Sequence, residues 1–250
     1  MLQILAACIF FTRLPFWRLA EVPALYFKRV VPFWPLTGWL TAGLSVLVFY
    51  LLSLFLPAGI ALLLAMITRL LVTGCLHEDG LADFMDGFGG GNNREQILRI
   101  MKDSHTGTYG VIGLIGYFAL FYLLLSSLPV EIAGTIWLVG DPLAKCISAM
   151  IINRLPYARE EKEAKNQTVY TRMTIPEYVF CIISGLLPLL WLPSFHYLGA
   201  ILFPVLAWIL LTNRMKKKIQ GYTGDCCGAT FLLCEVSFYL GVVMIYNLIA

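Results

Sequence analysis

The amino-acid sequence predicts an all-α protein, a polytopic membrane helix bundle of about seven transmembrane helices that forms one domain over residues 1–250. Hydrophobic residues make up 59% of the chain and charged residues 13%, whereas a soluble domain carries about a quarter charged residues. The mean hydropathy is +0.79. A spanning helix needs about 20 apolar residues, and seven apolar runs approach that length.

The seven runs follow one another along the chain. They cover residues 36–56, 58–76, 111–128, 130–152, 178–192, 196–211 and 229–248. The tight turn Leu56-Pro57-Ala58-Gly59 joins the first two and predicts a helical hairpin. The fifth run is the weakest, because it is short and contains Pro188. The apolar start, residues 1–11, has no small-residue cleavage site after it, so no cleavable signal peptide is expected.

The basic residues predict the orientation of these helices. Of the 18 Lys and Arg residues, all except Arg69 and Lys145 fall in the N-terminal tail before residue 36 or in the loops 77–110, 153–177 and 212–228. By the positive-inside rule, the N-terminus and these three loops face the cytoplasm, across an inner membrane. The net charge of +3 therefore reflects membrane orientation, and no nucleic-acid partner is expected.

The most informative motif lies in the first of these loops. Asp79, Asp83 and Asp86 are spaced i, i+4 and i+7, which places them on one face of a helix. Three carboxylates on one stripe repel one another unless a cation lies between them. Hard divalent cations prefer such oxygen ligands, so we expect Mg²⁺, with Mn²⁺ or Ca²⁺ as alternatives. Carboxylates this close to apolar spans indicate a functional site.

Two later polar segments have a related composition. Residues 93–101 predict a short amphipathic helix at the membrane interface. The string from Lys102 to Gly110 then places Asp103 and Ser104 just before a membrane helix, which is typical either of phosphate binding or of ordinary helix capping. The last loop carries Gly224 and Asp225 before another helix, and its lysines 216–218 are expected to contact anionic lipid.

Several other ionisable residues have more than one interpretation. Arg69 pairs either with Glu235 or with the aspartate cluster, and Asp141 with Lys145 at i, i+4 is expected to be a structural pair. His77 is a metal ligand, a general base, a hydrogen-bond donor to phosphate, or none of these. The seven cysteines show no zinc-type spacing and are expected to act as small buried hydrophobic residues.

Acids on one membrane face, surrounded by basic and glycine-rich loops, fit Mg²⁺-assisted chemistry on a diphosphate.

In order along the chain, three motifs carry a resemblance to a known family. They are His77-x-Asp79-Gly80-x-x-Asp83-x-x-Asp86-Gly87; Met101-Lys102-Asp103-Ser104 with Gly107-Thr108-Tyr109-Gly110; and Thr223-Gly224-Asp225 with Gly228-Ala229 and Glu235. Together with Phe11-Thr12-Arg13-Leu14-Pro15, they resemble the cobalamin synthase family, the adenosylcobinamide-GDP ribazoletransferases. Cys226-Cys227 and Glu78 depart from that pattern without removing an expected ligand.

The resemblance implies a Mg²⁺-dependent reaction of cobalamin biosynthesis. A ribose hydroxyl of α-ribazole, or of its 5′-phosphate, attacks the β-side phosphorus of adenosylcobinamide-GDP and GMP leaves. Asp86 or His77 is then a candidate base, beside the metal ligands Asp79, Asp83 and Asp86. The residues implied to bind substrate are Lys102, Asp103, Ser104, Gly224, Asp225 and Arg69. Membrane lipid is an expected partner, and the sequence leaves open whether the protein forms a homo-oligomer.

Two other functions fit parts of the sequence. The aspartate motif resembles, more loosely, the active-site signature of the CDP-alcohol phosphotransferases, but Asp83 follows Ala82 where that family has Arg. An aromatic prenyltransferase normally shows a second loop equally rich in aspartate, which the later loops here lack. A cation transporter would place its acids near the middle of the membrane, whereas most acids here gather at one face.

Overall fold

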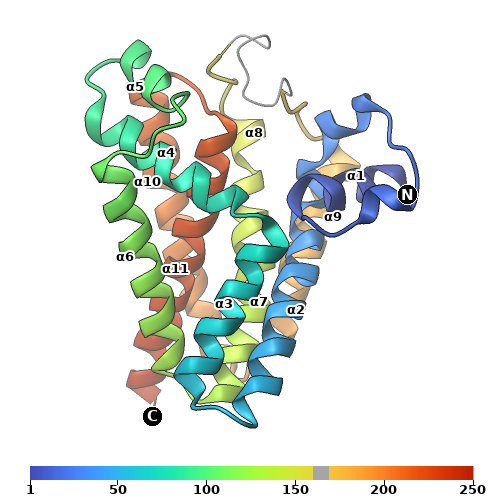
Figure 1. Ribbon diagram of the computed structural model, residues 1–250, viewed down its shortest axis with the longest axis vertical. Coiled ribbons are helices and arrows are strands. Elements are labelled where there is room, and N and C mark those ends of the chain that lie inside the picture. The colour runs from blue at the N-terminus through green and yellow to red at the C-terminus, as the bar shows by residue number, and fades with distance from the viewer. Residues whose placement is uncertain (160–168, 250) are drawn as a thin grey trace.

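A computed structural model describes residues 1–159 and 169–249 and confirms the all-α prediction, since these residues form helices and no β-strand. Part of the predicted loop 153–177, including Lys162 and Lys165, lies outside the described residues. The long helices run side by side between two ends of the molecule (Figure 1). Short helices and connecting segments gather at the end where α1 (Leu2–Phe11) lies (Figure 1).

Within the described residues, five helical segments are long and apolar enough to cross a membrane. They are Val31–Ser53, which is η3 (Val31–Phe33) with α2 (Trp34–Ser53); α6 (Thr108–Ser126); Val130–Arg154, which is α7 (Val130–Ala149) with α8 (Ile151–Arg154); Phe195–Ile219, which is η6 (Phe195–Ile201) with α10 (Leu202–Ile219); and α11 (Gly224–Ile249).

By length and apolar composition the described residues therefore contain five such spans, or six with one bent pair, against the seven that the sequence predicts. The second predicted run forms α3 (Ala58–Thr73), which becomes a sixth span only if it is counted with α4 (Leu76–Gly90), bent from it by 90°. The fifth run forms α9 (Ile175–Leu186) and the 3₁₀ helix η5 (Leu187–Trp191), which together are shorter than the helices that qualify as membrane spans. Pro188 lies where the α-helix changes to the 3₁₀ helix, because a proline ring is incompatible with a helix interior.

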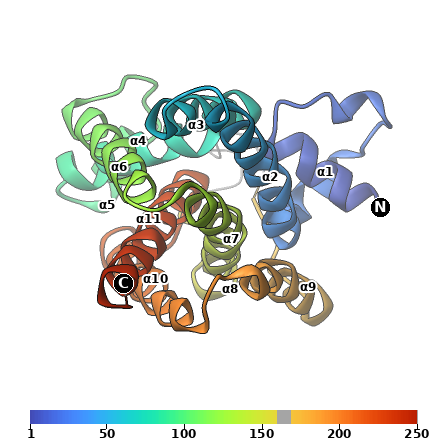
Figure 2. The ribbon, with the colours of Figure 1, turned by 90° about the horizontal axis from the view of Figure 1, so that it is seen from below.

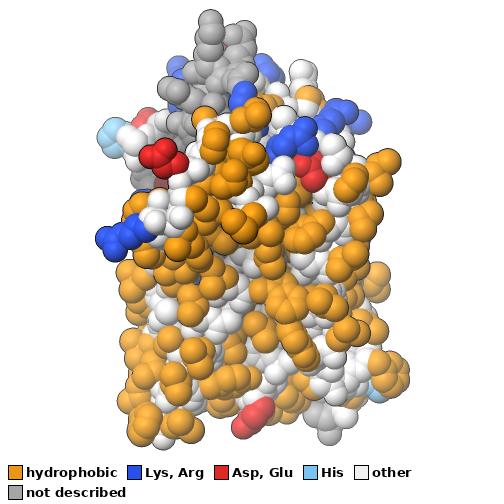
Figure 3. Space-filling view, turned by 90° about the vertical axis from the view of Figure 1, so that its right-hand side faces the viewer, with side chains coloured by type: hydrophobic (Ala, Val, Ile, Leu, Met, Phe, Trp, Pro, Cys, Tyr) orange, Lys and Arg blue, Asp and Glu red, His pale blue; other side chains and the backbone are white. Residues whose placement is uncertain are grey.

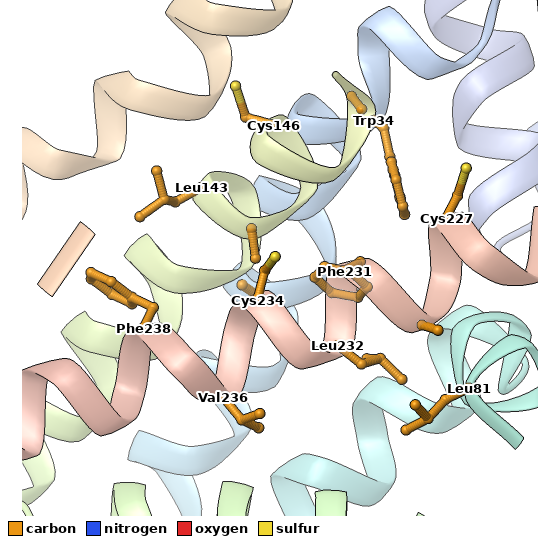
Figure 4. Packing of buried hydrophobic residues seen from close by; sticks show 14 of the residues in the cluster. Trp34, Leu81, Leu143, Cys146, Cys227, Phe231, Leu232, Cys234, Val236 and Phe238 are labelled. Carbon is orange, nitrogen blue, oxygen red and sulfur yellow. The ribbon is translucent and has the colours of Figure 1, made fainter. Parts of the chain in front are cut away.

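Helix α7 is the centre of the bundle. Of its apolar window 78% is buried inside the protein, against 28% for α6 and 22% for the η6–α10 segment. Figure 2 shows α2, α3, α6, α9 and α11 around it. The core between α7 and α11 includes Leu143, Phe231 and Phe238, which Figure 4 shows between these helices. The buried Asp141 and Lys145 form the predicted ion pair on α7, at 2.5 Å.

The surface has the two zones expected of a membrane protein. In the view of Figure 3 hydrophobic side chains cover the middle and lower part, and Lys and Arg gather toward the upper end. Many large apolar side chains are exposed on the spanning helices, among them Leu51, Ile115 and Leu206. In water such a continuous apolar surface would be unfavourable, so the molecule fits a multi-pass membrane protein.

At the upper end the remaining short elements complete the fold. Between α1 and η3 the chain forms the 3₁₀ helices η1 (Phe16–Arg18) and η2 (Ala24–Arg29). The predicted amphipathic helix is α5 (Arg94–Ile100), which buries Ile97 and begins at Asn93, whose side chain accepts a hydrogen bond from the Gln96 amide. That asparagine cap stabilises the helix end.

Candidate active site

A sharp turn between α3 and α4 brings the aspartate motif to one end of the bundle. Gly74 and Cys75 both have left-handed backbone angles, with φ of 65° and 58°. The left-handed region is favourable for glycine and uncommon for other residues. The side chain of Arg13 occupies the space where a Cβ at position 74 would lie. The turn sends α4 across the end of the bundle, as Figure 1 shows.

A cavity of about 140 Å³ opens where α1, α2, α4 and α11 meet. Four residues that the sequence predicts for the site line it: His77, Asp79, Gly224 and Asp225. The other lining residues are Phe10, Phe11, Val31, Trp34, Leu76, Tyr157, Arg159, Tyr170, Cys227 and Gly228. The structure thus joins the first and last predicted motifs in one hollow, although almost 150 residues separate them in sequence.

Glycines permit this close approach of α4 and α11. A Cβ on Gly80 would lie 3.1 Å from the Cα of Asp225, and one on Gly228 would lie 3.3 Å from the Cα of His77. Both distances are shorter than ordinary van der Waals contacts. The glycines of the two motifs therefore let Asp79 and Asp225 line the same cavity.

His77 belongs to an aromatic cluster. The rings of Phe11, Trp34 and His77 are nearly parallel, with interplanar angles of 12° to 20° and centroid separations of 5.3 to 6.2 Å. The indole Nε1 of Trp34 donates a hydrogen bond to Nε2 of His77 at 3.2 Å. A nitrogen that accepts a hydrogen bond carries no proton, so a neutral ring has its proton on Nδ1. The Nε2 lone pair of this predicted base is therefore already engaged.

Asp83 and Asp86 continue the motif along α4 but do not line the cavity. Both are buried, with 7% exposure each, while Asp79 is exposed. The Asp86 carboxylate accepts hydrogen bonds from the amides of Gly107, at 2.7 Å, and Gly110, at 2.9 Å. It therefore binds the N-terminus of α6, where the sequence analysis considered phosphate binding or capping. A carboxylate stabilises a helix N-terminus through its amides and dipole.

The segment of Lys102, Asp103 and Ser104 lies outside the cavity, in an exposed turn. Asp103 accepts a hydrogen bond of 2.7 Å from the ring of His105. That bond lowers the pKa of the Asp103 carboxyl. The structure thus does not bring these three predicted binding residues to the cavity.

Arg69 is the other predicted binding residue that lies away from the cavity. It is 3% exposed and pairs with Glu235, from Nη1 to Oε1 at 2.7 Å. Glu78 and Asp141 lie 3.7 and 3.9 Å from its guanidinium group. Of the two partners the sequence left open, the structure selects Glu235. Glu78 links this interior network to the first turn of α4.

Most residues of the cavity wall were not predicted from the sequence. Tyr157, Arg159 and Tyr170 come from the loop 153–177, which the sequence predicts on the cytoplasmic side and in which no site residue was predicted. Burial raises the pKa of Tyr157 to about 12 and that of Tyr170 well above its usual value, so both phenols keep their protons at neutral pH. Phe10 and Trp34 resemble ordinary apolar residues in the sequence, and Phe11 belongs to the opening motif without a predicted role; only tertiary contacts place all three at the cavity.

The carboxylates suit a hard cation without forming a complete cage. Among the described residues no group of three or more His, Cys, Asp or Glu side chains is arranged to hold a metal ion. Asp79 and Asp225 nevertheless offer oxygen ligands in one cavity, and Asp83 follows one turn after Asp79. Proteins commonly bind Mg²⁺ through one or two carboxylates, with water and substrate phosphates as the other ligands. The donor set fits that arrangement.

Comparison with known proteins agrees with these motifs. Residues 3–243 match the cobalamin-5-phosphate synthase family. Proteins named adenosylcobinamide-GDP ribazoletransferase from Shewanella sp. (strain W3-18-1) and Shewanella putrefaciens are each 37% identical over 98% of this chain and 95% of their own length. The protein of that name from Shewanella oneidensis is 36% identical over 94% of this chain and 91% of its own length. No solved structure matches. The chain belongs to the cobalamin-5-phosphate synthase family.

Proposed function

We propose that this protein is the adenosylcobinamide-GDP ribazoletransferase of cobalamin biosynthesis. It transfers the adenosylcobinamide-phosphate group of adenosylcobinamide-GDP to α-ribazole or its 5′-phosphate and releases GMP. Relatives with this name match nearly the whole chain. The observation that carries the proposal is the meeting of Asp79, from α4, and Asp225, from α11, at one cavity at the polar end of the bundle.

Mg²⁺ is the cofactor in this proposal. Asp79 and Asp225, which line the cavity, would hold the ion, and Asp83, one turn after Asp79 on α4, and diphosphate oxygens would be further ligands. When bound, the ion neutralises phosphoryl oxygens and so stabilises the charge that moves to the leaving GMP. Asp86, the third predicted ligand, holds the start of α6 against α4 through Gly107 and Gly110. Asp86 therefore contributes by fixing the orientation of α4, the helix that carries all three aspartates.

The chain's own residues supply orientation and a proton acceptor. In this proposal a ribose hydroxyl approaches the diphosphate beside the cavity carboxylates, and one of these carboxylates accepts the hydroxyl proton. His77 keeps the first turn of α4 in place through its bond to Trp34. The intact corrinoid substrate is far larger than the 140 Å³ cavity, so Lys102, Asp103 and Ser104 are proposed to contact parts of it that remain outside.

We place the protein in the inner membrane with the cavity facing the cytoplasm. The cavity lies at the end where the N-terminal segment and the basic loops gather, which the positive-inside rule assigns to the cytoplasm. Basic residues on this end, such as Lys216 and Lys217, are exposed and suited to contact with anionic lipid.

The decisive experiment measures GMP release by purified protein in lipid nanodiscs, given adenosylcobinamide-GDP and α-ribazole, with Mg²⁺ or with EDTA. We expect GMP and a cobalamin product only with Mg²⁺. Product formation that EDTA leaves unchanged would contradict the metal assignment. No GMP from folded protein would contradict the transferase proposal and favour tests with CDP-alcohols. Metal flux into vesicles without any nucleotide product would indicate a transporter.

A further inference from the structure

The cavity has two chemically different walls. Residues from α1, η3 and the start of α2 supply apolar surface, namely Phe10, Phe11, Val31 and Trp34. Polar groups come from the opposite elements, with Asp79 on α4 and Asp225 on α11. A ligand that fits both walls has an apolar part at one end and a phosphate or hydroxyl part at the other.

The apolar wall is aromatic as well as hydrophobic. Phe11 and Trp34 stack with 12° between their planes and 5.3 Å between their centroids, and His77 is nearly parallel to both. Tyr170, also in the lining, packs edge-on against Phe10 at 6.1 Å. Flat aromatic surfaces of this kind bind flat rings by stacking.

Two polar atoms beside these rings are already paired. The indole N–H of Trp34 donates to Nε2 of His77 at 3.2 Å. A base whose edge carries carbonyl and amino groups would lose its hydrogen bonds to water at the apolar rings and could not regain them from this pair, which is unfavourable. A base with a methylated hydrocarbon edge has no such hydrogen bonds to lose.

We propose that this aromatic wall, formed by Phe11, Trp34 and Tyr170, binds the flat apolar base of the acceptor nucleoside. The inference rests on the proposed function and adds the place of one substrate within the site. The dimethylbenzimidazole ring of α-ribazole stacks on the wall, and its ribose points toward Asp79 and Asp225. The guanine of the donor carries polar groups on its edge and binds outside this wall.

The test compares Phe11→Leu with Phe49→Leu as the matched control. Phe11 is 4% exposed and Phe49 2%, and both rings stack on an aromatic neighbour, Trp34 or Tyr50. Phe49 is absent from the cavity lining. Both variants lose the same ring in favour of the same aliphatic side chain, so a general packing defect affects both.

Two readouts are needed, both in nanodiscs. Equilibrium dialysis with labelled α-ribazole, without donor or Mg²⁺, measures binding that does not depend on turnover. Steady-state GMP release gives separate KM values for α-ribazole and for adenosylcobinamide-GDP. For Phe11→Leu we expect the Kd and KM of α-ribazole to rise roughly tenfold, the scale of one lost base–aromatic stack. The KM of the donor stays within about twofold, as does every constant of Phe49→Leu.

Three results would overturn the inference. Equal effects of the two variants would show a packing defect only. A rise in the donor KM alone would place guanine at the wall. Wild-type protein that releases GMP but binds α-ribazole no better than Phe11→Leu would leave the proposed function standing and remove this site. Failure of the proposed function is separate, because wild-type protein would then release no GMP whatever the dialysis shows.

Discussion

Arg69 of α3 and Glu235 of α11 form an ion pair inside the bundle, with Nη1 lying 2.7 Å from Oε1 and 2.9 Å from Oε2. Tyr117 and Tyr239 donate hydrogen bonds to the same carboxylate at 2.9 Å, and the Tyr117 hydroxyl also contacts Arg69. The pair thus connects α3, α6 and α11 directly beneath α4, so the position of the aspartate motif depends on it.

Replacing Glu235 tests this dependence. Glu235→Leu leaves the buried guanidinium of Arg69 without its main partner, and breaking a buried pair from one side costs about 3–5 kcal/mol. The expected result is a large loss of thermal stability in detergent. Arg29→Met serves as control, because the Arg29–Glu177 pair is 39% exposed on the arginine side and such pairs contribute about 1 kcal/mol or less. Equal destabilisation of both variants would contradict the interpretation.

Asp83→Asn tests the metal assignment. The amide is isosteric but supplies no negative charge to a hard cation, so we expect turnover to be abolished while the protein still inserts and melts normally. Membrane fractionation and GMP release measure the two properties. The control is Glu131→Gln, an exposed acid in the first turn of α7, for which activity stays at the wild-type level. Near-normal turnover of Asp83→Asn would show that the metal ligands lie elsewhere.

His77→Gln tests whether His77 is a base. A glutamine amide oxygen can accept the indole N–H that Trp34 donates to His77, so we expect the variant to retain a hydrogen bond to Trp34. If the bond holds α4 in place, kcat falls less than about tenfold, whereas loss of a general base costs about 10²–10⁴. His77→Phe removes the acceptor and is expected to lower the free energy of unfolding by about 1–3 kcal/mol. A fall of several hundredfold in His77→Gln would assign the base to His77.

Gly80→Ala tests the close crossing of α4 and α11. The new methyl group would lie 3.1 Å from the backbone of Asp225, and backbone atoms cannot move away without shifting a helix. We expect lower thermal stability and loss of turnover together. Gly116→Ala in α6 is the matched control, because its Cβ meets nothing within 4 Å, and in a helix it gains about 0.5–1 kcal/mol. Unchanged activity of Gly80→Ala would mean that α4 and α11 can move apart at this crossing without loss of turnover.

Membrane orientation is testable with single cysteines. Cys75 is the one cysteine classed as exposed in the described part of the chain, so Cys75→Ser provides the background. Lys217→Cys and Glu131→Cys then place thiols at exposed positions on α10 and on the first turn of α7. In right-side-out vesicles an impermeant maleimide should label position 131 and reach position 217 only after permeabilisation. The reverse pattern would contradict the proposed cytoplasmic site.

By itself the sequence determined the all-α membrane class, the grouping of the basic loops on one side of the bundle and the helical stripe of Asp79, Asp83 and Asp86. These properties depend on composition and on the period of 3.6 residues per helical turn, and both can be read from residues close together in the chain. The family motifs likewise identified His77, Asp79, Gly224 and Asp225, and all four line the cavity.

Only the tertiary structure decided which distant groups meet. Helix α4 is bent by 90° from α3. The amides of Gly107 and Gly110 donate hydrogen bonds to Asp86, and Arg69 forms an ion pair with Glu235 in the interior. The tertiary structure also formed the aromatic wall of the cavity, for whose residues the sequence predicted no role in the site. Such contacts depend on how whole helices pack, and a buried charge takes the nearest opposite charge in space because low-dielectric surroundings make an unpaired one costly.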